Sequence, residues 1–311
     1  MLSTLPIECP AFLLDKASLL PRTTTAVINA GSTLVLQSCR LASDEGLIEP
    51  VLIGDRGAIA STAQQIDWDI SDIRIIHAPD DIASAQVAVA LARGGEVASL
   101  MKGNIHTDDL LRAVIDKQTG LRTGTRLSHV FHMTIPGSDQ SLCITDAVIN
   151  VLPSIDIQLD IARNVTKLMH SLGNSAPKIA VLSATEVANE GMPSSMQAAK
   201  LVEHAEQGEV SGAVLGGPFA FDNAVSPAAA KLKGIDHPVA GHADVLLVPN
   251  IETGNALFKQ MVYFMSAAAA GVVLGAKVPI ILTSRADPAA ARLASTALAS
   301  IYADYCVNLS A

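Results

Sequence analysis

Short apolar stretches alternate with longer helix-like stretches along almost the whole chain, and this alternation limits the possible folds more than any other feature. Strands are predicted at residues 25–29, 51–53, 73–76, 97–101, 178–182, 210–215, 245–248 and 278–282. Helices are predicted between them, including residues 32–46, 81–93, 157–172 and 194–207. Repeated βα units predict an α/β fold, with mainly parallel sheets covered by helices on both faces. In such folds ligands bind at the carboxyl ends of the strands.

The composition fits this fold and predicts two domains. The chain has 311 residues, of which 50% are hydrophobic and only 3% aromatic, so Ala, Val, Ile and Leu fill the core. That mixture is typical of parallel strands buried on both faces. The length and the number of elements predict two α/β/α domains. Residues 121–136 show few clear periods, so we expect the crossover between the domains there.

Charge and cysteine content narrow the classes of partner. The net charge is −9 and no run of lysine or arginine occurs, which argues against nucleic acid as a partner. The four cysteines form no CxxC pair and indicate a reducing, cytoplasmic setting; they are Cys9, Cys39, Cys143 and Cys306. We expect no signal peptide, because no basic region is followed by an apolar one at the N-terminus.

The apolar segment 262–283 resembles a membrane span in length, but Lys277 and Pro279 interrupt it. Its Ala/Gly-rich first half predicts a packed helix and its end predicts a strand. We therefore expect no membrane partner.

The first chemical motif is Pro279-Ile-Ile-Leu-Thr-Ser-Arg-Ala-Asp-Pro288. The strand leads Ser284 and Arg285 into a loop, and an alanine-rich helix starts near Pro288. A hydroxyl and a guanidinium beside the positive end of a helix dipole are suited to phosphate or another oxyanion. No Gly-x-Ser-x-Gly elbow surrounds Ser284, which favours a hydrogen-bond donor over a nucleophile. For Asp287 a helix N-cap is favoured over a catalytic base, and both roles stay open.

The second motif, Lys102-Gly-Asn-Ile-His-Thr107, joins a strand end to a helix start. Four nearby side chains offer hydrogen-bond donors to an anion: Lys102, His106, Thr107 and Arg112. Purely structural roles are equally open, since Thr107 can cap the helix and Arg112 can pair with Asp108 or Asp109 one turn earlier.

The third motif is Gly216-Gly-Pro-Phe-Ala-Phe-Asp-Asn-Ala-Val-Ser226, also expected at a strand end, where its glycines permit a tight turn. Asp222 can reach a ligand there or stabilise its own turn. His129 and His132 lie two residues apart without a third ligand at suitable spacing, so no metal site is predicted.

Taken together, several segments resemble the phosphate acetyl/butyryltransferases, most closely the butyryl type. They run in order from about residue 97 to 300: Met101-Lys-Gly-Asn-Ile-His-Thr107, Gly120-Leu-Arg-Thr-Gly124, Ile144-Thr-Asp-Ala147, Gly217-Pro-Phe-Ala-Phe-Asp-Asn-Ala224, Ala243-Asp-Val-Leu-Leu-Val-Pro249, Gly254-Asn255 and Pro279-Ile-Ile-Leu-Thr-Ser-Arg285. These enzymes exchange an acyl group between coenzyme A and inorganic phosphate.

The resemblance implies two α/β/α domains of the isocitrate/isopropylmalate dehydrogenase type, with an active cleft between them, in a homodimer. The first domain would comprise residues 1–122 plus 284–311, and the second residues 123–283.

The resemblance also implies roles for individual residues. Ser284 and Arg285 match the family's serine-arginine pair at the reaction centre, and Arg112 its second phosphate-binding arginine. The second and third motifs add Lys102, His106, Thr107 and Asp222 as candidate ligand contacts, and Asn255 is added from the matching Gly254-Asn255 pair. Acetyl-type enzymes place a proposed base seven residues after the serine, where this chain has Ala291. Asp287 is the nearest acid, so the identity of the base is open.

The implied reaction is acyl-CoA plus phosphate giving acyl phosphate plus coenzyme A. It requires no metal and no tightly bound cofactor, because coenzyme A is itself a substrate. An alternative is a non-catalytic acyl-CoA-binding module, similar to the domains appended to malic enzymes. The presence of Ser284, Arg285 and Arg112 argues against that alternative. A decarboxylating dehydrogenase is disfavoured, since no cluster of aspartates for a divalent metal can be assembled at the strand ends.

Overall fold

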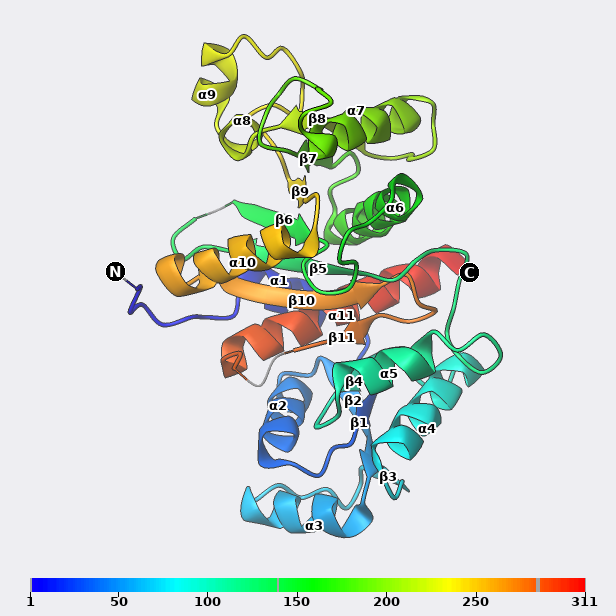
Figure 1. The fold of residues 1–311 in the computed structure, drawn as a ribbon. Helices are drawn as coiled ribbons and strands as arrows, with labels where there is room; N and C mark the ends of the chain where they lie inside the picture. Colours follow the sequence, from blue (N-terminus) through cyan, green and yellow to red (C-terminus); the bar gives the residue numbers. More distant parts are fainter. Residues whose placement is uncertain (1, 139, 284–285, 311) are drawn as a thin grey trace. The chain divides into compact units, whose positions relative to one another are not determined.

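The computed structural model describes residues 2–138, 140–283 and 286–310, and its contacts divide the chain into two compact units (Figure 1). The terminal unit comprises Ile7–Thr125 and Ala270–Ala311, and the central unit comprises Met1–Pro6 and Arg126–Ala269. The domain boundaries implied by the resemblance remain a proposal.

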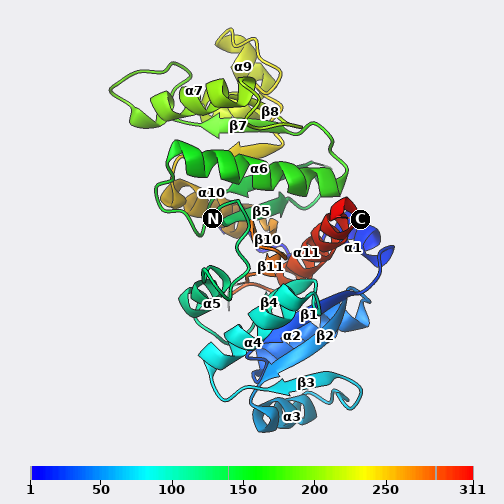
Figure 2. The same cartoon turned by 90° about the vertical axis from the view of Figure 1, so that its right-hand side faces the viewer.

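The terminal unit is built on a mainly parallel run of strands. Its order is β3-β2-β1-β4-β11-β10, in which β10 alone is antiparallel to its neighbour. Figure 2 shows β1, β2 and β3 side by side. The bounds are β1 Thr23–Ile28, β2 Ile48–Gly54, β3 Arg74–His77, β4 Ser99–Lys102, β10 Ala268–Leu274 and β11 Ile280–Ile281.

Helices cover both faces of these strands. The helices α4 and α5 pack together on one face, while α2 packs with α3 and α11 on the other (Figure 1). The long helix α11 also packs against α1. The bounds are α1 Ala11–Ser18, α2 Thr33–Asp44, α3 Arg56–Gln65, α4 Asp81–Gly94, α5 Thr107–Val114 and α11 Ala289–Ser310.

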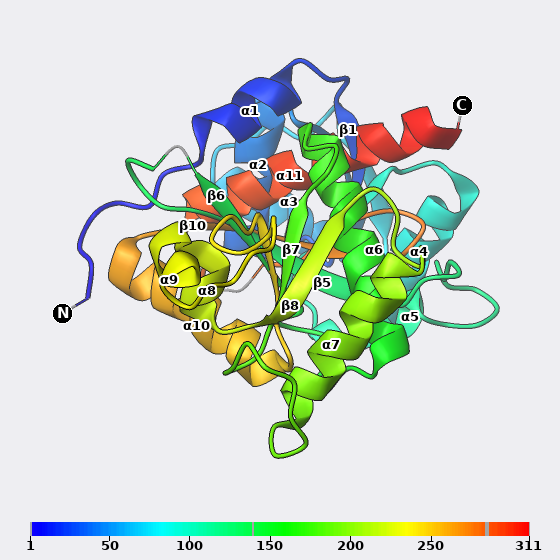
Figure 3. The ribbon, with the colours of Figure 1, turned by 90° about the horizontal axis from the view of Figure 1, so that it is seen from above.

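The central unit repeats the plan with five strands in the order β5-β6-β9-β7-β8, where only the pair β5/β6 is antiparallel. In Figure 3, α6 and α7 lie on one side of these strands, and α8, α9 and α10 on the other. The bounds are β5 Ser128–Thr134, β6 Ser141–Thr145, α6 Ile155–Leu172, β7 Lys178–Leu182, α7 Pro193–Glu206, β8 Val214–Phe219, α8 Phe221–Val225, α9 Pro227–Leu232, β9 Val245–Leu247 and α10 Ile251–Met265. The predicted α/β class with mainly parallel strands is confirmed.

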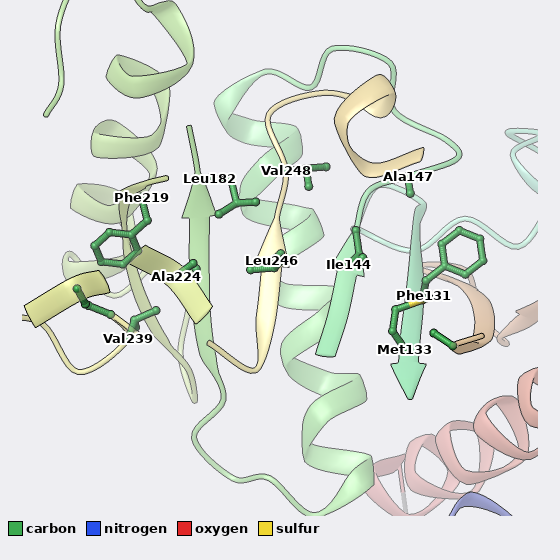
Figure 4. Close-up of a cluster of buried hydrophobic side chains, with 14 residues drawn as sticks. Phe131, Met133, Ile144, Ala147, Leu182, Phe219, Ala224, Val239, Leu246 and Val248 are labelled. Atoms are coloured by element: carbon green, nitrogen blue, oxygen red, sulfur yellow. The ribbon is translucent and has the colours of Figure 1, made fainter. Parts of the chain in front are cut away.

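The core of the central unit shows why these residues form buried strands (Figure 4). Every residue of β9 is buried, and Leu246 packs in one cluster with Ile144 and Leu182. The ring of Phe131 on β5 stacks on that of Phe258 on α10, with their centroids 4.0 Å apart. An apolar run without alternation fits a strand covered on both faces.

The predicted helix in the first half of segment 262–283 is wrong. The helix α10 ends at Met265, where Ser266 adopts a left-handed conformation with φ of 50°. The side-chain hydroxyl of Ser266 donates a hydrogen bond to the carbonyl of Leu5. The following alanine-rich segment is the strand β10, in which all residues but Ala269 are buried. Burial between layers overrides the helical propensity of alanine here.

One further prediction is corrected. The strand expected at residues 210–215 begins later, as β8, and includes Gly216 and Gly217 rather than ending before them. A Cβ atom at Gly217 would lie 2.6 Å from the carbonyl oxygen of Val181 on β7, so this glycine permits close strand packing and not a tight turn. The division between the two units falls at Thr125 and Arg126, within the segment 121–136 where the crossover was expected, and the same segment contains the buried strand β5.

The buried His132 of β5 gives a pH-dependent contribution to stability. Burial lowers its pKa from 6.5 to about 4. Between these values the unfolded chain binds a proton that the folded chain does not, so the contribution is fully present above pH 6.5 and is lost as the pH falls toward 4. We expect a loss of about 3 kcal/mol over this window. Urea unfolding at pH 7.5 and 4.5 measures the free energy of unfolding. Between these two pH values, His132→Leu should lose less of this free energy than the wild-type protein. Equal losses in the two proteins would contradict the assignment.

Candidate active site

A cavity lies at the carboxyl ends of three neighbouring strands in the terminal unit. The register places Ile28 of β1 beside Lys102 of β4, and Met101 of β4 beside Ile281 of β11. The cavity has a volume of about 270 Å³ and includes the first turns of α2 in its wall. Its lining residues are Ser32, Leu34, Val35, Ser38, Met101, Lys102, Gly103, Asn104, Ile281, Thr283, Arg292 and Thr296. This is the edge at which parallel α/β sheets bind ligands.

The loop after β4 is locked onto the loop after β1. The N–H of Asn104 donates to the carbonyl of Asn29 at 3.2 Å, and the side-chain amide of Asn29 donates back to the carbonyl of Asn104 at 2.8 Å. The same amide donates to Asp81 Oδ1 at 2.6 Å. A Cβ atom at Gly103 would lie 2.1 Å from the carbonyl oxygen of Ile28, so the close approach requires glycine. The wall of the cavity is therefore fixed by backbone contacts.

Among the described residues that line the cavity there are two cations and no acid. One cation is Lys102, which is half-buried at the end of β4. The other is Arg292 in the first turn of α11, whose Nε donates to Ser38 Oγ at 2.7 Å and whose Nη1 donates to the carbonyl of Asp287. Burial lowers the pKa of Arg292, and the nearby Asp287 offsets this in part. Such a cavity suits an anion.

Sequence reasoning missed Arg292. It stands in an alanine-rich helix and belongs to no motif, so nothing local distinguishes it from a solvated surface arginine. The only available signal was its position four residues after Pro288, in a helix expected to follow a strand end.

Of the four donors predicted in the second motif, only Lys102 lines this cavity. His106 is exposed at the N-cap position of α5, and Thr107 is the first helical residue. The structural alternative in which Thr107 caps α5 does not hold, because His106 stands at the N-cap position. No side-chain hydrogen bond caps this end within the described part of the chain.

Arg112 does not line the cavity that contains Lys102. Its side chain is 73% exposed, and its Nη1 donates to Asp109 Oδ1 at 2.9 Å. It lines a separate pocket of about 530 Å³ together with Arg93 of α4. This ion pair is the purely structural role that the sequence left open for Arg112. Exposed ion pairs contribute only ~0–1 kcal/mol to stability, so the pair can break at little cost. A phosphate-binding role for Arg112 remains a proposal.

The predicted reaction-centre pair, Ser284 and Arg285, lies outside the described residues. Asp287 is described and half-buried. Its carbonyl accepts a hydrogen bond from Arg292, and the next carbonyl, that of Pro288, accepts the N–H groups of Ala291 and Arg292. The helix thus starts where the sequence predicted it.

Asp222 and Asn255 belong to the central unit. The carbonyl of Asp222, an exposed residue of α8, accepts the N–H of Ser226 and closes its own turn. Asn255 is half-buried in the first turns of α10, which begins after the N-cap Asn250. Ligand contacts by either residue remain predictions.

The described residues contain no group of three or more His, Cys, Asp or Glu side chains able to hold a metal ion. None of their helices combines the length and the apolar character needed to cross a bilayer.

Fold and cavity together define an α/β protein with a cationic site at the carboxyl ends of parallel strands. Residues 81–300 match the family model of the phosphate acetyl/butaryl transferases. The chain belongs to this family.

Relatives of both acyl types are similar to the chain over most of its length. It is 47% identical over 262 residues to the phosphate acetyltransferase of Rhizobium meliloti, covering 84% of this chain and 83% of the relative. It is 38% identical over 278 residues to the phosphate butyryltransferase of Clostridium acetobutylicum, covering 89% of this chain and 92% of the relative.

Among solved structures, a branched-chain phosphotransacylase from Enterococcus faecalis is 30% identical with a TM-score of 0.79, covering 90% of this chain and 99% of that one. A 4-hydroxythreonine-4-phosphate dehydrogenase from Burkholderia phymatum shares the fold alone. It is 15% identical with a TM-score of 0.56, and the match covers 90% of this chain and 98% of that one. The dehydrogenase-like architecture is confirmed.

Proposed function

We propose that this protein is a phosphate acyltransferase that interconverts acyl-CoA plus phosphate and acyl phosphate plus coenzyme A. The observation that carries the proposal is the family match over residues 81–300. The cavity supports it, because its described lining residues include two cations and no acid, which suits anionic substrates. Coenzyme A is then a substrate, and we propose no tightly bound cofactor.

In the proposed reaction a phosphate oxygen attacks the thioester carbonyl, an oxyanion forms, and the thiolate of coenzyme A leaves with the electron pair of the C–S bond. Two anionic substrates repel each other, so the site must supply cations. Holding them in a reactive geometry can contribute up to ~7–11 kcal/mol. Following the resemblance, Ser284 donates to the carbonyl oxygen or to the sulfur, and Arg285 and Arg112 bind phosphate. Lys102, from the motif at the end of β4, is a further candidate for binding anionic oxygens.

A thiol with a pKa of about 8.5 must lose its proton in the direction toward acyl-CoA. Asp287 is the acid nearest the predicted reaction centre, and it also supports Arg292 through its carbonyl.

For Asp287→Asn we expect turnover within about tenfold of wild type, because asparagine keeps the backbone carbonyl that accepts the hydrogen bond of Arg292. Steady-state rates across pH 5–9 measure this. A larger loss, with one limb of the pH profile missing, would identify Asp287 as the base.

The assay that tests the function is release of coenzyme A from acyl-CoAs of two to six carbons, straight and branched, with and without phosphate. A thiol reagent detects the product. Phosphate-dependent release with any member supports the transferase. Tight binding of coenzyme A without release from any member would instead favour the non-catalytic acyl-CoA-binding module.

We also propose a homodimer and a cytoplasmic location, on the family resemblance and the four separated cysteines. Sedimentation equilibrium of the purified protein tests the first proposal, since a dimer has twice the 32.3 kDa mass of the chain.

A further inference from the structure

The cavity of the terminal unit contains an arginine to which the sequence motifs assign no role. Arg292 is half-buried, and its guanidinium is held from two sides. Its Nε donates to the hydroxyl of Ser38 on α2, and its Nη1 donates to the backbone carbonyl of Asp287. Both acceptors are neutral oxygens, so they orient the guanidinium without cancelling its charge. Two of its five N–H groups are used in this way.

The surroundings of Arg292 suit one chemical class of ligand. The second cation in the described part of the wall is Lys102, and no lining residue that the structure describes is acidic. The wall also includes the first turns of α2, whose N-cap Ser32 makes no side-chain capping bond. N–H groups at a helix start attract anions. The cavity volume of about 270 Å³ leaves ample space for a tetrahedral phosphoryl group.

Burial makes the charged form of Arg292 costly in the absence of an anion. It lowers the pKa of this arginine, although the Asp287 carboxylate lies near enough to offset part of the effect. A bound dianion would remove the remaining penalty, because charge-assisted hydrogen bonds to a guanidinium are roughly twice as strong as neutral ones.

We propose that Arg292 and Lys102 bind a phosphoryl group in this cavity, with Ser38 as the residue that positions the guanidinium. The proposal rests on the proposed function, which offers two sources of such a group. One is inorganic phosphate, and the other is the phosphorylated nucleotide end of coenzyme A. The chemistry of recognition is the same for both sources.

The test is calorimetric titration of wild type and Arg292→Gln with three probes: inorganic phosphate, coenzyme A and dephospho-CoA, which lacks the 3′-phosphate. We expect the variant to raise the Kd of at least one phosphorylated probe about tenfold or more, as loss of a charge-assisted hydrogen bond predicts. Weaker phosphate binding identifies inorganic phosphate as the occupant. Weaker binding of coenzyme A but not of dephospho-CoA identifies the 3′-phosphate, and weaker binding of both identifies the pyrophosphate.

The matched control is Arg74→Gln, which removes one positive charge from the same unit at an exposed ion pair with Glu96. We expect it to bind all three probes as wild type does. If Arg292→Gln binds every probe within twofold of wild type, the proposal is overturned.

Two milder variants keep the proposal testable if Arg292→Gln does not fold. Arg292→Lys keeps the charge but loses the planar, bidentate guanidinium. Ser38→Ala removes the bond to Nε, together with the bond that this hydroxyl donates to the carbonyl of Leu34. Both should weaken the same probe by smaller factors, and unchanged binding in both would overturn the proposal. Binding is measured without turnover. An inactive wild type would therefore refute the proposed transferase function, while the titrations would still show whether Arg292 binds a phosphoryl group. Conversely, an active wild type whose Arg292 variants bind normally would refute only the role of Arg292.

Discussion

Replacing Arg285 with alanine is expected to lower phosphate-dependent turnover at least ~100-fold while the protein remains folded, as loss of a preorganised charge-stabilising donor does. Arg285 lies outside the described residues, so this expectation rests on its match to the family's serine-arginine pair. Its neighbours in sequence support it, since Thr283 lines the cavity and the carbonyl of Asp287 holds Arg292. Arg285→Lys should recover only part of the rate, because lysine lacks the bidentate fork.

The measurement is kcat and KM for acyl-CoA and phosphate, combined with thermal unfolding to show that the variant folds. Arg74→Ala is the control for loss of one positive charge. A rate for Arg285→Ala within tenfold of wild type would refute its place at the reaction centre.

The second large effect is expected from Gly103→Ala, and it concerns stability. The new Cβ would lie 2.1 Å from the carbonyl oxygen of Ile28 and 2.8 Å from that of Asn29. Both are backbone atoms at the end of β1, so the two loops must separate and break the hydrogen bonds that join Asn29 and Asn104. We expect a loss of ~3 kcal/mol in the free energy of unfolding.

Because Gly103 lines the cavity, the Kd for a bound anion should rise as well. Urea unfolding measures the first effect. The control is Gly94→Ala near the end of α4, where the added Cβ meets only a side-chain oxygen of Glu96 at 4.0 Å. That variant should be as stable as wild type, and equal stability of both variants would show that the loops accommodate the methyl group.

Much of the fold was predictable because it follows from local pattern. The strand at residues 178–182 and the helix starting near Asp81 agree with the structure, since a short apolar run and an Asp N-cap are local signals. The failures have a common cause. The alanine-rich strand β10 looks helical by propensity, and only burial against neighbouring layers makes it a strand. The strand β8 includes glycines that local pattern places in a turn.

The candidate site, like the fold, was predictable only in part. The sequence motif around Lys102 led to the correct strand end, because the carboxyl ends of parallel strands meet at one edge of a sheet. It left open whether Arg112 binds an anion or pairs with Asp108 or Asp109, since that choice depends on side-chain packing. In the structure Arg112 pairs with Asp109 and lines a second pocket. Arg292 could not be found from the motifs, because its importance comes from contacts with Ser38 and Asp287.

The α/β class, the family and the strand end that carries Lys102 follow from the amino-acid order, because each depends on residue types in a fixed order along the chain. That Gly103 must be glycine and that Arg292 shares a cavity with Lys102 became clear only from the folded chain. These facts depend on the parallel pairing of β1, β4 and β11, which brings residues more than 70 positions apart into contact.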